Sequence, residues 1–296
     1  MRIFAAIALL CLSVSAFAET TSWVPLEIEK GKIVIPITLN GKPARASLNT
    51  HSHRNLISQA FLDTHEGEFA KGQNAVVDIM RLEVLGTELE IEELLTTDYK
   101  DIDLDIGLPF FEQYVVQIDY PGQRMRFMDH ESIDMKKLAN VKMRRASGSR
   151  LPQVRVKLNG KVKAWLMFST GGNGPIKYER ANAERRGWLE DYAVTQAEYD
   201  GVDDSAANVD LLRLPTMTIG PFELENVLVR VSADDDSNGQ SRLRDSHETG
   251  FRLQKGGKKK ADGSLGFDVL QDFIVTIDLK RNRLSLDIPQ PEPDGP

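Results

Sequence analysis

The chain has 296 residues, a formal net charge of −7 and 41% hydrophobic residues. This length is sufficient for one large or two medium hydrophobic cores. The balance is acidic, and no extended basic face or interleaving of basic with aromatic residues is visible along the chain, so a nucleic-acid partner is not expected.

The first 18 residues are typical of a secretory signal peptide. Arg2 supplies a positive charge, Ile3–Val14 is apolar, and Ala16-Phe17-Ala18 matches an A-x-A cleavage signal. The apolar run is too short for a good transmembrane span. We therefore expect cleavage after Ala18 and an exported, periplasmic protein. The mature chain would then contain no cysteine and hence no disulfide, and no later segment reads as membrane-spanning.

The same order of local patterns occurs twice. Ile35–Lys42 (IPITLNGK) and Val154–Lys161 (VRVKLNGK) each combine alternating apolar residues with an Asn-Gly pair. Alternation is typical of half-buried strands, and Asn-Gly favours a type I′ hairpin. Each hairpin leads into a short polar loop, Asn49-Thr50-His51 in the first copy and Ser169-Thr170-Gly171 in the second.

Later elements repeat in the same order. Each copy has a short helix (Asn55–Phe61; Tyr178–Arg186), a strand pair (76–84 and 89–95; 212–219 and 222–231), a glycine turn into a helix (from Gly107; from Gly266) and a closing hairpin (115–120 and 123–128; 274–279 and 283–286). An ungapped alignment of 107–127 with 266–286 keeps Gly107/Gly266, Val116/Val275, Ile118/Ile277, Asp119/Asp278 and Arg124/Arg283. Because strands dominate each copy, the sequence predicts a duplicated all-β protein with two barrel or sandwich lobes.

The expected organisation follows from this repeat. It comprises a signal peptide (1–18), an N-terminal lobe (19–145), a C-terminal lobe (146–288) and a Pro-rich tail (289–296). Residues 232–262 are polar and charged with almost no apolar periodicity, which indicates a disordered loop inserted in the second lobe.

With these motifs in order, the chain resembles the retropepsin-like (clan AA) aspartic proteases in a bacterial, exported, two-lobed form. In that family each lobe has a hairpin leading into an Asp-Thr-Gly loop, then a Gly-x-x-hydrophobic helix and an Ile-Asp-Tyr strand. The later motifs correspond here to Gly107–Tyr120 and Gly266–Leu279, and the resemblance covers nearly all of 24–288. It implies a pepsin-like fold of two β-barrel lobes with short helices.

The departures from the family pattern concern its chemistry. The family uses two facing carboxylates that share a proton and activate a water. The matching positions hold Asn49 and Ser169, neither of which is a carboxylate. His51 replaces the first loop's Gly, and its ring would crowd the contact between the loops. Thr50 and Thr170 are kept, and the resemblance implies that their hydroxyls tie the loops together. We therefore expect no catalytic dyad and no aspartic protease activity.

Two other chemistries fit the same loops. Ser169 could act as a nucleophile with His51 opposite it across a pseudo-two-fold axis, which gives a non-standard peptidase or hydrolase. His51 and His53 form an H-x-H pair, but His65, His130 and His247 show no ligand spacing, so no metal or other cofactor is expected.

Several aspartates offer weaker alternatives. Asp119 and Asp278 could be replacement acids, although their repeated Ile-Asp context favours surface or turn-stabilising carboxylates. Asp200, Asp203 and Asp204 surround Gly201 and could lie in a flap over the groove, although a flexible loop fits this composition better.

The function expected from the sequence is binding without catalysis. An extended peptide or protein partner would lie between the lobes, since strand addition to a groove does not need catalytic acids. The groove residues would be Asn49, Thr50, His51, Ser169, Thr170 and Gly171. A purely structural subunit is a third possibility; it would have side chains filling the subsites beside Asn49 and Ser169.

Overall fold

The structure is a computed structural model that describes residues 22–65, 76–84, 87–172, 174–200, 206–232 and 261–289. The expected signal peptide lies outside these ranges, as do most of the 232–262 loop and of the Pro-rich tail. None of the helices in the described ranges is long and apolar enough to cross a membrane.

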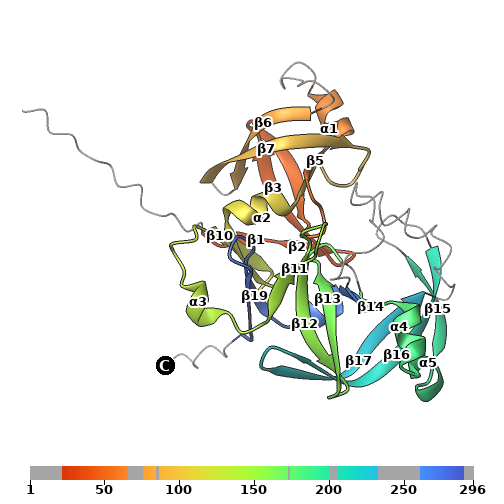
Figure 1. Ribbon diagram of the computed structural model, residues 1–296. Helices are drawn as coiled ribbons and strands as arrows, with labels where there is room; N and C mark the ends of the chain where they lie inside the picture. Colours follow the sequence, from red (N-terminus) through yellow and green to blue (C-terminus); the bar gives the residue numbers. More distant parts are fainter. Residues whose placement is uncertain are drawn as a thin grey trace, which may run out of the picture.

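The N-terminal lobe is a seven-stranded sheet in the order β2-β3-β4-β8-β5-β7-β6, which closes on itself because β3 also pairs with β6 (Figure 1). Its elements are β2 (Glu27–Glu29), β3 (Lys32–Leu39), β4 (Lys42–Leu48), β5 (Asn55–Ser58), α1 (Gln59–Thr64), β6 (Val76–Val84), β7 (Thr87–Thr97), β8 (Leu104–Ile106) and α2 (Leu108–Gln113). Asn40 (φ 47°) and Gly41 (φ 80°) turn β3 into β4. Positive φ at both positions confirms the type I′ hairpin.

The C-terminal lobe is an eight-stranded sheet in the order β11-β12-β13-β18-β14-β17-β16-β15, closed by pairing of β12 with β16. Its elements are β11 (Met143–Arg145), β12 (Pro152–Leu158), β13 (Val162–Phe168), β14 (Ile176–Tyr178), α4 (Arg180–Arg185), α5 (Trp188–Asp191), β15 (Thr195–Asp200), β16 (Ala206–Ile219), β17 (Phe222–Ser232), β18 (Gly263–Leu265) and α7 (Phe267–Leu270). Strand order corresponds to that of the first lobe: β13 pairs with β18 in parallel, as β4 pairs with β8.

A third sheet joins the lobes, in the order β1-β10-β9-β19-β20. Its strands are β1 (Val24–Pro25), β9 (Val115–Asp119), β10 (Arg124–Met128), β19 (Ile274–Asp278) and β20 (Arg283–Asp287), with α3 (Met135–Leu138) in the connection after β10. Its centre is the antiparallel pair β9–β19, in which Gln117 is opposite Thr276 and donates to the Thr276 hydroxyl at 2.9 Å. These two residues are equivalent in the sequence repeat, so a pseudo-two-fold axis passes between them.

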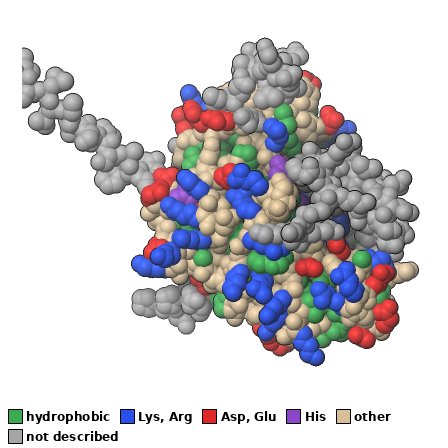
Figure 2. All heavy atoms as spheres, in the orientation of Figure 1, with side chains coloured by type: hydrophobic (Ala, Val, Ile, Leu, Met, Phe, Trp, Pro, Cys, Tyr) green, Lys and Arg blue, Asp and Glu red, His purple; other side chains and the backbone are tan. Residues whose placement is uncertain are grey.

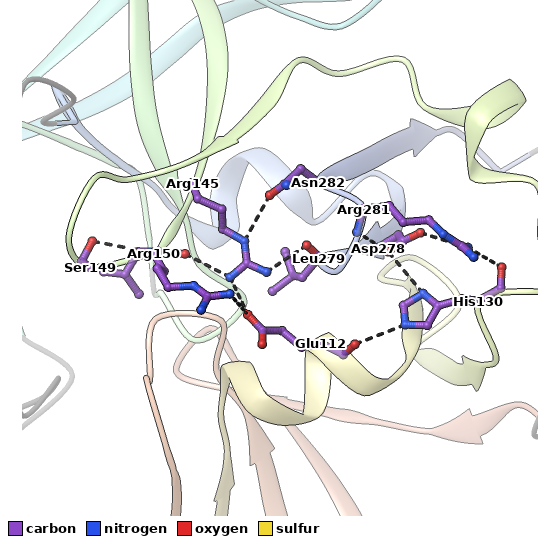
Figure 3. Close-up of polar contacts among 10 residues, drawn as sticks. Glu112, His130, Arg145, Ser149, Arg150, Asp278, Leu279, Arg281 and Asn282 are labelled. Carbon is purple, nitrogen blue, oxygen red and sulfur yellow. Dashed lines mark hydrogen bonds and ion pairs between the residues drawn. The ribbon is translucent and has the colours of Figure 1, made fainter.

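Buried apolar side chains from both lobes form one continuous core, so the lobes are packed against each other rather than merely tethered. Polar contacts add to this packing (Figure 3). Arg145, the last residue of β11, contacts Glu112 at 2.9 Å and donates to the carbonyl of Leu279 at 2.8 Å and to Asn282 at 3.1 Å. Glu112 belongs to the first lobe and Leu279 to the second, so Arg145 links the two.

His130, which the sequence showed only as an isolated histidine, lies in the same network (Figure 3). Its side chain is buried, with Nε2 3.2 Å from the carbonyl of Glu112 and Nδ1 3.3 Å from Oδ1 of Asp278. Arg281 donates to the His130 carbonyl at 2.6 Å. His130 therefore takes part in joining the lobes.

The predicted helix Asn55–Phe61 is wrong in its start. Asn55 begins strand β5, and its side chain accepts from the Gly107 amide at 2.9 Å and donates to the Glu92 carbonyl at 3.2 Å. Ser58 is the N-cap of α1 instead. Asparagine is a favoured N-cap residue, but the side chain of Asn55 is hydrogen-bonded to residues distant in the sequence, which hold it in strand β5.

The predicted helix Tyr178–Arg186 also begins later, at Arg180. Tyr178 is in strand β14, and its ring stacks on Trp188 at 4.8 Å. Gly187 follows α4 with φ 70°, as expected for a helix that ends at this glycine.

Candidate functional site

Two equivalent loops meet where the lobes face each other. Asn49 is the first residue after β4, and Ser169 is the first after β13. Because β4 pairs in parallel with β8 and β13 with β18, each loop leaves its sheet beside a second strand. The sheets thus fix the position and direction of both loops.

Four hydrogen bonds connect the loops across the pseudo-two-fold axis. Thr50 Oγ1 donates to the Phe168 carbonyl at 2.9 Å, and Thr170 Oγ1 donates to the Leu48 carbonyl at 2.8 Å. Each hydroxyl also accepts from the other threonine's amide at 3.1 Å. Both threonines are fully buried, at 0% and 1% exposure, so these bonds lie in a water-excluded site.

Glycines allow the neighbouring backbones to approach. A Cβ at Gly107 would lie 2.1 Å from the Arg54 carbonyl oxygen, and one at Gly266 would lie 2.2 Å from that of Gly174. Gly171 packs directly on the Asn49 side chain, since a Cβ there would lie 3.1 Å from its Oδ1. The two loops are therefore in close contact at Asn49.

The Asn49 side chain is half-buried and has a fixed orientation. Its Oδ1 accepts from the His51 amide at 2.9 Å, and its Nδ2 donates to Oδ2 of Asp105 at 3.3 Å. An amide with these two partners presents its remaining N–H as a donor. It cannot exchange protons as a dyad carboxylate does.

Ser169 and His51 were considered as an alternative nucleophile and base. Ser169 is 5% exposed and packs beside Gly172, and among the described residues no hydrogen bond joins it to His51. His51 occupies the loop position where a glycine was expected. The expected crowding is not visible, because all four threonine bonds form with His51 in place.

Asp105 is the residue of this site that sequence reasoning missed. It lies in the middle of β8, opposite Ser47 of β4, and Ser47 Oγ donates to its Oδ1 at 2.5 Å. Its neighbours Leu104 and Ile106 are buried in the core, so Asp105 is on the opposite face, with Asn49. An aspartate between two apolar strand residues was the available signal.

Burial raises the pKa of Asp105 to about 6, although hydrogen bonds from Ser47 and Asn49 and the charge of Lys32 favour its ionised form. Desolvation disfavours a charged carboxylate, and here it outweighs those contacts. The carboxyl can therefore change its protonation between mildly acidic and neutral pH.

The second lobe lacks this carboxyl. Its strand pairing places Met167 opposite Ser264, where the first lobe has Ser47 opposite Asp105. The site is consequently asymmetric: the buried carboxyl of Asp105 in the N-terminal lobe has a serine, Ser264, at the equivalent position of the C-terminal lobe.

Asp119 and Asp278, which were considered as replacement acids, both accept hydrogen bonds from backbone amides. Asp119 accepts from the amide of Gly122 at 2.9 Å, and Asp278 accepts from that of Arg281 at 2.9 Å. Both carboxylates close equivalent turns, and both are buried rather than at the surface.

In the described part of the chain, no group of three or more His, Cys, Asp or Glu side chains could hold a metal ion. Burial, with a smaller effect of Arg54, lowers the pKa of His53. His65 belongs to the end of α1, and His247 lies outside the described residues.

A hairpin of β15 and β16 exists where a flap was considered. Its tip, with Asp203 and Asp204, lies outside the described residues. A hollow of about 350 Å³ lies elsewhere, on the β16–β17 hairpin, lined by residues that include Arg213 and Pro215. It is not part of the site around Asn49.

No family model matches the chain, and no curated protein matches its sequence. Among solved structures, it is similar to basic 7S globulin from soybean, at 9% identity and a TM-score of 0.47, covering 91% of this chain and 95% of that one. It is also similar to a retropepsin-like aspartic protease from Rickettsia conorii, at 12% identity and a TM-score of 0.29, covering 38% of this chain and 93% of that one. By its own strand order and pairings, the chain has a two-lobed, all-β fold of the aspartic-protease-like type.

Proposed function

We propose that this protein binds an extended peptide or a protein partner between its lobes and does not cleave it by aspartic protease chemistry. In this proposal the chain is exported to the periplasm, with residues 1–18 as its signal peptide. The partner is a polypeptide, and no cofactor takes part.

One observation carries the proposal: the loop framework is intact while both dyad positions lack a carboxylate. The reciprocal bonds of Thr50 and Thr170 hold the loops together at 2.8–3.1 Å. Asn49 and Ser169 occupy the equivalent positions that would have to share a proton. A scaffold kept without its acids is suited to binding.

The strand arrangement supports an extended ligand. β15 is at the end of the C-terminal sheet order, so among the described residues one side of this strand has no neighbour within the sheet. An extended peptide can add to such an edge through main-chain hydrogen bonds. Asn49, half-buried and fixed by His51 and Asp105, would offer a side-chain donor to a ligand between the lobes.

The test is retention and cleavage of a complex peptide library by the purified protein, read by mass spectrometry from acid to neutral pH with and without a chelator. An Asn49→Ala/Ser169→Ala variant is the comparison, and Gln59→Ala/Thr64→Ala on α1 is the matched control. We expect defined peptides to be retained uncut by the parent and the control, and less by the site variant.

Each other result favours a different function. Cuts made by the parent but not the site variant would favour the hydrolase that uses Ser169 with His51. Cuts lost only with chelator would favour a metal site at His51 and His53. If the parent neither retained nor cleaved any peptide, a structural subunit would be favoured.

A further inference from the structure

The outer face of β11, β12 and β13 gathers cations that are scattered in the sequence. Strand pairing places Arg144 opposite Gln153, Arg155 opposite Trp165, and Lys157 opposite Lys163. Directly paired residues of antiparallel strands share a face of the sheet. We call Arg144, Arg155, Lys157, Lys163 and Trp165 the basic face.

This face is directed away from the lobe core. The alternate residues of the same strands are buried: Val154, Val156, Leu158, Ala164 and Leu166 are at most 2% exposed. Lys157 and Lys163 are exposed, whereas Arg155 and Trp165 are half-buried. Figure 2 shows Lys and Arg side chains gathered over the region where Figure 1 draws β12 and β13.

Three of the four cations of this face have no carboxylate partner within the described structure, whereas Arg144 interacts with the charge of Asp262. Among the described residues, Arg155, Lys157 and Lys163 form no ion pair. The nearby carboxylate of Asp262 accepts from the Trp165 amide at 2.9 Å, and Glu223 borders the face beside Thr218. In a chain with a net charge of −7, such a face is a local exception.

An arginine–tryptophan pair forms the rigid part of the face. The Arg144 guanidinium stacks over the Trp165 ring at 4.0 Å, and its Nε donates to Gln153 Oε1 at 2.8 Å. Tryptophan is suited to a boundary between polar and apolar surroundings. Lys157 and Lys163 have no such fixed partners in the part of the chain that the structure describes, so their ammonium groups can adjust to anions at variable positions.

We propose that the basic face docks on an anionic phospholipid bilayer. A strand surface with two exposed lysines and one half-buried tryptophan fits a fluid layer of negative headgroups. A protein interface would be centred on a desolvated apolar core, and Trp165 and the half-buried Met167 are the apolar residues at this place. Each Lys or Arg near an anionic leaflet increases partitioning about fivefold.

The experiment is co-sedimentation of the whole chain with vesicles of phosphatidylcholine alone or mixed with phosphatidylglycerol. We expect binding only to the anionic vesicles, with loss in about 1 M salt, where the Debye length falls to about 3 Å. Lys157→Glu/Lys163→Glu should reduce partitioning at least about 25-fold, since two attractive charges are removed. Lys157→Arg/Lys163→Arg should bind like the parent.

The matched control is Lys100→Glu/Lys136→Glu, which changes the net charge equally at exposed positions outside these strands. It should retain most of the binding. Failure of the parent to bind anionic vesicles, or equal losses in both glutamate variants, would overturn the proposal. Binding to polyglutamate or a nucleic acid, but not to vesicles, would overturn it in favour of an anionic macromolecule.

Discussion

Asn49 donates from Nδ2 to Oδ2 of Asp105 at 3.3 Å, so the amide at the start of the first-lobe loop is hydrogen-bonded to a buried carboxyl of its own lobe. This carboxyl replaces neither member of a facing pair, because the second lobe has Ser264 at the equivalent strand position. The relationship makes Asp105 the main determinant of how the site responds to pH.

Asp105→Asn should reduce the pH dependence of stability between about pH 4 and pH 7. Burial raises the pKa of Asp105 from 3.8 to about 6 in the folded chain. The folded state therefore binds the proton more tightly, and the stability that this carboxyl contributes below pH 4 is lost as pH rises through 6. The loss in the parent is about 3 kcal/mol. Denaturant unfolding of both proteins across this range measures it, and identical pH slopes would contradict the prediction.

Asn49→Asp should be tolerated poorly at neutral pH. It would place two carboxylates at the 3.3 Å separation of the present hydrogen bond, a repulsion on the order of 5 kcal/mol at an effective dielectric constant of 20. The pair should instead share a proton, so the variant should take up about one proton near neutral pH. Asn49→Asp/Asp105→Ser should remove the effect. Potentiometric titration and urea unfolding of the set are the measurements, and equal behaviour of the single and double variants would exclude the coupling.

Thr50→Val should destabilise the fold by about 2–4 kcal/mol, because it removes one donor and one acceptor in a water-excluded site. Thr50→Ser keeps the hydroxyl and should cost about 1 kcal/mol for the lost methyl group. Each hydroxyl takes part in two different bonds, but all four bonds hold the same two loops together. Thr50→Val/Thr170→Val should therefore cost less than the sum of the single variants, because loss of one pair of bonds already loosens the contact that the other pair holds. Chemical unfolding tests all three; a valine variant as stable as the serine variant would show that the bonds contribute little.

Gly107→Ala should be far more damaging than Gly41→Ala. A Cβ at Gly107 would lie 2.1 Å from a backbone oxygen, so the backbone has to move and the loss should exceed about 4 kcal/mol. Gly41 has open space and φ 80°, so its replacement should cost about 1–2 kcal/mol for the left-handed conformation alone. The yield of folded protein and the thermal unfolding temperature of the two variants measure the difference. Similar losses would mean that the contact between β8 and the Asn49 loop can relax.

Local chemistry was sufficient to predict much of the fold. The Asn-Gly pairs specify their own turns, because asparagine and glycine adopt positive φ readily; Asn40 and Asn159 both do so in the structure. The repeated closing segments become β9 and β19, which pair with each other. These features depend on neighbours in sequence or on symmetry, so a pattern is enough to find them.

The features that the sequence did not predict have a common physical cause: they depend on pairing between strands that are distant in the sequence. Asn55 looked like a helix cap, yet β8 and β7 use its side chain. Asp105 had no visible role until β4 placed Ser47 opposite it. The basic face was invisible for the same reason, because its members come from three strands with buried residues between them.

The pairing of β9 with β19 has a further consequence. Its register is symmetric about Gln117 and Thr276, with Val116 opposite Ile277 and Ile118 opposite Val275. Each lobe therefore presents the same edge to the other, which is the isologous relation of two identical subunits in a dimer. A lobe separated from its partner would still present a self-complementary strand. The oligomeric state of an isolated lobe would thus depend on its concentration. Two copies in a homodimer would rebuild the sheet that the two lobes of one chain now form.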